Sequence, residues 1–448
     1  MDYVLIKHGK IIENGVVHHK DVLIGNEKII ELGDKIERPE PETPVIDAGG
    51  KYLLPGAVDT NILFSDLIKQ DDLALKRFNQ AQILCGTSTV IEPIIPQISF
   101  SYKEELHRRK NMEYDIKADY GFHLSMSNWE VLNAEDLEFC YAHEGIASFY
   151  LRWPAKKREV SHIHSLFKAA AKSNTPVLID MQKPGDIESG QPEMSRIYNE
   201  TITNHLSQLR AVLDSAIDAG CFVCVLNICF KEELNIIEKV SKSGQVYAEI
   251  LFPFHIANSD KIFVGNNSIY SGFPLVDKLN LLSEDDIWRC LKKDNFFVSR
   301  PRIKLSGQGV LSDSQVDNRP DEYILLKNLL SVLYTWGVTE NNITMADLIE
   351  VIAGRTSRFM GLYPQKGVLQ IGSDADIVIW NPDYRRNLYC HLPGVNEEGA
   401  KHFPLEGRVE FVFVKGCMVY NGESFSVDKV KGRYLYRSPY YIKESDSN

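Results

Sequence analysis

The middle of the chain alternates helix and strand patterns joined by short connections. In the segment HLSQLRAVLDSAIDAG, apolar residues recur at helical spacing, and Gly220 stands where that helix would end. The apolar run CFVCVLNI follows at once, and after it come a second amphipathic segment closed by Gly244 and the run QVYAEILF. This order is typical of βαβ units with short connections. Repeated over about 300 residues, it predicts an α/β fold with a (β/α)8 TIM-like barrel.

Both ends of the chain carry a different pattern. The first fifty residues read as short β runs separated by glycine and asparagine turns, and similar runs return at 374–380 and 409–420. A composite β-sandwich domain made from both chain ends would account for the two sets. The predicted division is a sandwich from 1–54 and 368–435, a barrel from 55–367 and a polar C-terminal tail from 436–448.

Charge and composition exclude several classes of partner. The 448-residue chain has a formal net charge of -11, whereas binding to phosphate backbones depends on concentrated lysine and arginine. We therefore expect no nucleic-acid partner. The chain has no apolar run long enough for a membrane span and no signal-peptide pattern at its start, so we expect no membrane association and a cytoplasmic location. The 8 cysteines are too dilute for a disulfide scaffold, and we expect free thiols.

Six segments carry a family signature. They are PGAVD (55–59), GTSTVIEP (86–93), DYGFHLSMSNW (119–129), GFPLVDK (272–278), GLYPQKGVLQIGSDADIVIWNP (361–382) and KGRYLYR (431–437). In order, they resemble segments of the dihydropyrimidinase (hydantoinase) branch of the amidohydrolase superfamily, and the resemblance runs over nearly the whole chain. It implies a (β/α)8 barrel beside a composite β-sandwich, in agreement with the strand and helix pattern.

The resemblance also implies a metal centre whose ligands this sequence replaces. Active members hold two divalent metals with four histidines, a carbamylated lysine and an aspartate, and a metal-bound hydroxide opens a cyclic amide. Leucine cannot ligate a metal, a phenol cannot form the carbamate bridge, and a guanidinium repels a cation. We therefore predict no metal, no other cofactor and no catalytic residue. The former metal-site positions are Asn61, Leu63, Tyr150, Asp180, Asn227 and Arg300.

The former metal space must be filled, because an unpaired buried charge is costly. We hypothesise that Arg300 or Arg152 pairs with Asp180 and, together with Tyr150, occupies this space. His123 stands where the family also carries a histidine. It either faces the pocket or is a buried, hydrogen-bonded histidine, and the sequence favours neither reading.

Other histidines and cysteines form patterns that favour packing over chemistry. His162 and His164 make an H-x-H motif, but it lies in an amphipathic helix and reads as a surface helix. Cys221 and Cys224 point to opposite faces of an apolar strand, so core packing is the better interpretation. His255 lies close to a P-x-H element that is usually structural in the family and is weak evidence for chemistry.

We interpret the protein as a catalytically inactive dihydropyrimidinase-like protein. It is similar to the collapsin response mediator (dihydropyrimidinase-related) family, whose first motif also has asparagine at the first histidine position, as in PGAVDTN. The likeness implies a homotetramer, or a hetero-oligomer with paralogues, that acts as a scaffold or regulatory partner of an unidentified protein. A cytoskeletal or signalling role would fit that family, but the chain departs from it at Tyr150, Asp180 and Asn227 and lacks its long basic tail.

Two other functions remain open from the sequence. One is a metal-independent cyclic-amide hydrolase or cyclase that uses Asp180, Tyr150 or His123 as acid or base. The other is a sensor in which Arg152 and Arg300 recognise a small anionic metabolite. Both need an open pocket, whereas a scaffold does not.

Overall fold

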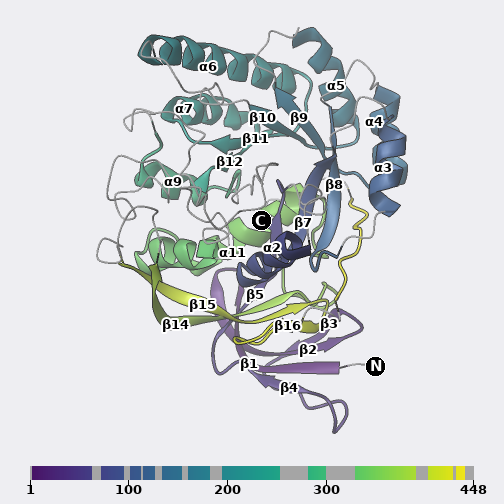
Figure 1. Cartoon of the computed structure of the whole chain (residues 1–448), viewed down its shortest axis with the longest axis vertical. Coiled ribbons are helices and arrows are strands. Elements are labelled where there is room, and N and C mark those ends of the chain that lie inside the picture. The colour runs from purple at the N-terminus through teal and green to yellow at the C-terminus, as the bar shows by residue number, and fades with distance from the viewer. Residues whose placement is uncertain are drawn as a thin grey trace, which may run out of the picture.

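A computed structural model of the chain describes eleven stretches, which build two sheets of eight strands each. In Figure 1 one sheet and its helices form the upper part of the molecule, and the other sheet lies below them. The described residues are 3–62, 72–94, 101–111, 115–126, 134–153, 160–181, 194–252, 281–298, 328–389, 402–426 and 430–438.

The upper sheet is a parallel one whose strands follow their sequence order and curl into the predicted (β/α)8 barrel. Its strands are short and largely buried on both faces, as expected where helices cover a parallel sheet. The strands are β6 (Ala57–Asp59), β7 (Thr87–Ile94), β8 (Asp119–Ser125), β9 (Phe149–Trp153), β10 (Val177–Met181), β11 (Val223–Ile228), β12 (Val246–Ile250) and β13 (Phe296–Val298).

Helices alternate with these strands and lie on the outer side of the sheet in Figure 1. The predicted helix before Gly220 is the second half of α6, and Gly220 follows it with a φ of 71°, which ends the helix without strain. Around the barrel strands are α2 (Asp72–Leu84), α3 (Tyr102–Asn111), α4 (Ala134–Glu144), α5 (Val160–Lys172), α6 (Met194–Asp218), α7 (Lys231–Val240), η1 (Ser241–Ser243) and α9 (Glu284–Leu291), and after β13 come η3 (Leu333–Thr339), α11 (Met345–Ile349), η4 (Glu350–Gly354) and α12 (Arg355–Phe359).

The lower sheet belongs to a composite β domain that draws on both chain ends, as predicted. Purple strands from the N-terminus and yellow-green strands from the C-terminus lie side by side in Figure 1, where β5 pairs antiparallel with β14. The limits expected for each domain stay a prediction. The strand order is β16 (Cys417–Tyr420), β15 (His402–Val414), β14 (Ile377–Tyr389), β5 (Tyr52–Pro55), β1 (Tyr3–Glu13), β2 (Val16–Gly25) and β3 (Lys28–Gly33), with β4 (Val45–Asp47) paired to β1.

Residues 430–438 run from the β domain up beside β8, as the yellow segment in Figure 1 shows. The backbone N–H of Tyr120 donates to the carbonyl of Arg433 (2.9 Å), and that of Leu435 donates back to Tyr120 (2.8 Å). Arg437, which the sequence placed in a polar tail, is buried, and its backbone N–H donates to Gly145 (3.1 Å). This part of the C-terminus is therefore packed on the barrel; residues 439–448 lie outside the described part of the chain.

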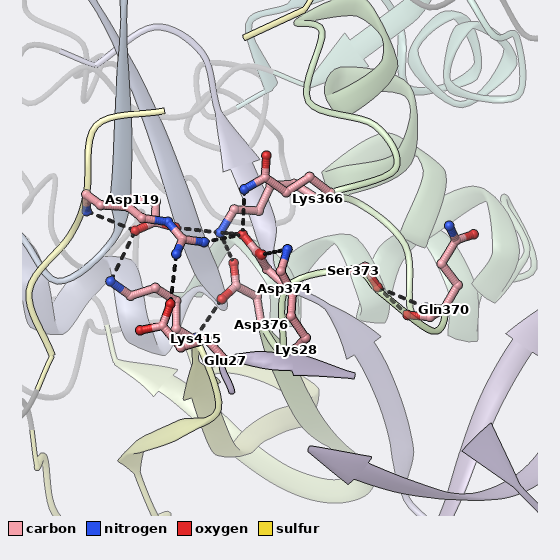
Figure 2. A network of polar contacts seen from close by, with 11 residues as sticks. Glu27, Lys28, Asp119, Lys366, Gln370, Ser373, Asp374, Asp376 and Lys415 are labelled. Carbon is pink, nitrogen blue, oxygen red and sulfur yellow. Dashed lines mark hydrogen bonds and ion pairs between the residues drawn. The ribbon is translucent and has the colours of Figure 1, made fainter. Parts of the chain in front are cut away.

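A network of charged side chains joins the two domains (Figure 2). At its centre, the buried Lys366 ammonium lies 2.7 Å from Asp119, 2.9 Å from Asp374 and 2.6 Å from Asp376. Asp119 begins β8 of the barrel, while Asp374 and Asp376 lie within three residues of the start of β14 in the β domain. Burial lowers the pKa of Lys366, but the three carboxylates outweigh it and hold this pKa above its ordinary value. Lys366 is therefore a charged link between the domains.

Four further side chains complete this junction network. Arg433 pairs with Glu27 (2.7 Å) and Asp374 (2.9 Å), Lys415 lies 3.5 Å from Asp119, and Lys28 pairs with Asp374. Burial raises the pKa of Asp374, but its cationic neighbours hold it below its usual range. The network thus combines four cations with four carboxylates, so its buried charges are balanced.

No helix in the described part of the chain is both long enough and apolar enough to cross a membrane.

Candidate functional site at the carboxyl ends of the barrel strands

Tyr150 and Asp180 lie together inside the barrel. They come from the neighbouring strands β9 and β10, and the Tyr150 hydroxyl donates a hydrogen bond to Oδ2 of Asp180. Tyr150 is 2% exposed and Asp180 is 9% exposed. The Tyr150 ring packs in an apolar cluster of the barrel interior with Leu178 and Cys224. Two of the predicted former metal-site positions are therefore in direct contact with each other.

The two asparagines stand at strand ends facing the same way along the barrel. Asn61 follows β6 and is buried, and its backbone N–H donates to Oδ1 of Asp59 (3.2 Å). Asn227 is the penultimate residue of β11, with a φ of 58°, at a register shift between Val225 and Ile228. Asparagine is among the few residues that adopt this left-handed conformation readily, so it is compatible with the irregular strand end. Leu63 and Arg300 lie outside the described residues.

The side chains at these positions do not fit the ligand set of a centre with two divalent metals. Zinc sites of the expected kind use imidazole and carboxylate ligands, whereas the described positions offer two amides, a phenol and one carboxylate that already accepts a hydrogen bond. Within the eleven described stretches, no group of three or more histidine, cysteine, aspartate or glutamate side chains could hold a metal ion. Loss of the metal ligands stays a prediction, because it extends to Leu63 and Arg300.

Arg152 does not fill the former metal space. It is exposed at the end of β9, and among the described residues it makes no ion pair with Asp180. The part of the hypothesis that rests on an Arg152–Asp180 pair is therefore wrong. Tyr150 and Arg152 share one face of β9, but Arg152 lies two residues nearer the strand end and reaches solvent.

His123 is a buried, hydrogen-bonded histidine. It is 0% exposed; its Nε2 lies 2.8 Å from the Thr60 carbonyl, and its Nδ1 contacts the Ser148 hydroxyl. A carbonyl can only accept, so Nε2 carries the proton and Nδ1 accepts from Ser148. The Ser148 hydroxyl in turn accepts from Arg437 Nη1 (2.7 Å). Burial, and after it the charge of Arg437, lower the pKa of His123 well below its ordinary value despite the bond to Thr60, so the ring is neutral.

A continuous polar chain therefore crosses the barrel interior. It starts at Arg437 of the C-terminal segment and passes through Ser148 and His123 to the Thr60 carbonyl. The Thr60 hydroxyl donates in turn to Oε2 of Glu249 (3.3 Å). We call this set the interior relay. Sequence reasoning did not single out Ser148, Thr60 or Glu249; the KGRYLYR segment that contains Arg437 was noted, but not for this contact.

The remaining sequence patterns are structural where they are described. Cys221 and Cys224 are buried free thiols, and burial raises both pKa values, which confirms core packing. His164 lies in α5, half-buried, with Nδ1 3.1 Å from the Ser215 carbonyl of α6. The His162 side chain and the whole of His255 lie outside the described residues.

Comparison with curated proteins finds relatives along the whole chain. It is 23% identical to the D-hydantoinase of Geobacillus stearothermophilus over 471 aligned positions, which cover 99% of this chain and 98% of that protein. It is 22% identical to the dihydropyrimidinase of Dictyostelium discoideum, covering 98% of this chain and 91% of that protein. The chain is a relative of the hydantoinases and dihydropyrimidinases.

One of these relatives is named as related to dihydropyrimidinase rather than as that enzyme. Dihydropyrimidinase-related protein 5 of Rattus norvegicus is 22% identical, and the match covers 86% of this chain and 72% of that protein. The fold comparison agrees: a solved structure of D-hydantoinase superposes with a TM-score of 0.78 at 22% identity, covering 98% of this chain and 100% of that one. No protein-family model matches the sequence. These comparisons confirm two predictions, the relationship to the hydantoinase branch and the barrel fold.

Proposed function

We propose that this chain is a catalytically inactive relative of the hydantoinases that works as an oligomeric scaffold or regulatory partner. The observation that carries the proposal is the contact between Tyr150 and Asp180. These residues stand at positions where the resemblance places a carbamylated lysine and a histidine, and there they bind each other. A phenol that donates to a neighbouring carboxylate supplies neither a bridging ligand nor an imidazole.

The interior relay weakens the case for a metal-independent hydrolase. Both ring nitrogens of His123 are used, one by Thr60 and one by Ser148. A general base needs a free lone pair within reach of the substrate proton, and Nδ1 of His123 instead faces a buried hydroxyl. Asp180 and Tyr150 would remain as acid and base, but they already form a hydrogen bond with each other.

The proposed assembly is a homotetramer, or a hetero-oligomer with paralogues, in the cytoplasm. Its support is the likeness to dihydropyrimidinase-related proteins and the net charge of -11, which disfavours nucleic acid as a partner. Function would then reside on outer surfaces of the barrel and β domain, because function on a shared fold belongs to particular sites rather than to the fold.

The proposal is tested by measuring turnover of hydantoin and dihydrouracil with zinc supplied, alongside the molar mass of the assembly by light scattering. We expect no turnover above the uncatalysed rate and a mass that is a multiple of 50.9 kDa. Turnover that Asp180→Asn abolishes and Arg152→Gln retains would support a hydrolase instead. A monomer at all concentrations would remove the oligomeric scaffold.

A further inference from the structure

Two arginines on neighbouring strands of the β domain have no acidic partner among the residues that the structure describes. Arg386 lies on β14, and its Nη2 donates only to neutral oxygens, Asn328 Oδ1 (2.5 Å) and Ser331 Oγ (3.3 Å). Arg408 lies on β15, and its described contact is a ring: its guanidinium carbon lies 4.0 Å from the centroid of Tyr384. The Nε atoms of both arginines are buried without a hydrogen-bond partner.

The electrostatic surroundings of Arg386 confirm that a counter-charge is missing among the described residues. Burial lowers the pKa of Arg386, the phenols of Tyr384 and Tyr420 raise it, and Arg408 lowers it again. The charged group that acts on Arg386 is thus another arginine. Two half-buried like charges repel, and a buried donor without an acceptor is costly to keep.

Arg385, the residue before Arg386, does have an acidic partner on the neighbouring strand. Arg385 is exposed, and its Nε lies 3.4 Å from Oε1 of Glu406 on β15. Arg386 is the next residue on β14 and points away from that carboxylate to the other face, as alternate strand residues do. Glu406 therefore lies on the Arg385 side of the strand pair and does not neutralise Arg386.

Two tyrosines interact with these arginines. The Arg408 guanidinium stacks on Tyr384, which fixes the plane of its donors. The Tyr420 hydroxyl donates to the Gly422 carbonyl (2.9 Å), and its ring packs on Phe425 with centroids 4.9 Å apart. Burial raises the pKa of Tyr420, whereas the charges of Arg408 and Arg386 lower it.

We propose that Arg386 and Arg408 form a binding site for a phosphate-type oxyanion, with the Tyr384 ring as its wall. Guanidinium groups match the geometry of tetrahedral oxyanions with paired donors, and two of them favour a dianion over a monocarboxylate. The ligand would supply the counter-charge that the described residues do not. The site lies in the β domain and is independent of the function proposed for the barrel.

The test is thermal unfolding of the full chain in inorganic phosphate, with chloride and acetate at the same ionic strength. A ligand that binds only the folded state raises the midpoint with its concentration. Phosphate should raise it and the other anions should not. In Arg408→Gln, phosphate should bind about tenfold more weakly or worse, whereas the matched control Arg385→Gln should respond like the wild type.

Without phosphate, Arg408→Gln should unfold close to the wild-type midpoint, because the lost stacking on Tyr384 and the relieved repulsion from Arg386 oppose each other. The unfolding midpoint without phosphate therefore distinguishes loss of the site from loss of folding. An equal phosphate response in wild type and Arg408→Gln, no response at all, or an equal response to acetate would each overturn the proposal.

Discussion

The junction network and the barrel interior are both buried and polar, but their groups are satisfied differently. At the junction, Lys366 contacts three carboxylates within 2.9 Å, and further cations balance them. In the barrel interior, hydroxyl groups donate hydrogen bonds to buried carboxylates: Tyr150 donates to Asp180, and Thr60 donates to Glu249. The junction links the two domains, whereas these two interior contacts join residues of the barrel alone. We therefore expect the junction to contribute more to the stability of the fold than the contacts at the strand ends.

The largest expected effect is at the junction. Lys366→Met would leave Asp119, Asp374 and Asp376 without their central cation, and we expect a loss of about 3–5 kcal/mol in the free energy of unfolding. Denaturant titration measures it. The control is Lys28→Met, whose side chain is 37% exposed and should cost about 1 kcal/mol or less. Equal losses in both variants would contradict a central role for Lys366.

A smaller loss is expected in the barrel interior. Tyr150→Phe removes the hydroxyl that donates to Asp180 and should destabilise the chain by about 1.5–3 kcal/mol, the range for a hydrogen bond to a charged group. Arg152→Gln, on the same strand but exposed, should stay within about 0.5 kcal/mol of the wild type. A costly Arg152→Gln together with a neutral Tyr150→Phe would reverse the assignment of the Asp180 partner.

The neutral state of His123 predicts a pH dependence. Its folded pKa is lowered, so below the ordinary histidine pKa of about 6.5 the unfolded chain binds a proton that the folded chain does not. Its contribution to stability is therefore lost as pH falls below that value, by about 1.4 kcal/mol per pH unit. His123→Gln should remove this part of the slope between pH 7 and 5. An unchanged slope in the variant would mean that His123 takes up its proton in the folded chain as it does in the unfolded chain.

The sequence predicted the architecture well because its signals are local. The helical spacing before Gly220 and the β runs at both ends each depend on residues close together in the chain. The candidate site was predicted less well, because its contacts join distant positions. Thr60, His123, Ser148 and Arg437 meet only after the C-terminal segment packs beside β8, and no pattern in KGRYLYR signals that one of its arginines is buried.

The central claim, that the barrel no longer serves as a metal-dependent hydrolase site, is tested most directly by zinc content. The full chain, expressed with zinc and dialysed against zinc-containing buffer and then metal-free buffer, should retain far less than stoichiometric metal by mass spectrometry. Asp180→Asn should give the same value, because Asp180 is held by Tyr150. Stoichiometric zinc in the wild type that disappears in Asp180→Asn would contradict the claim.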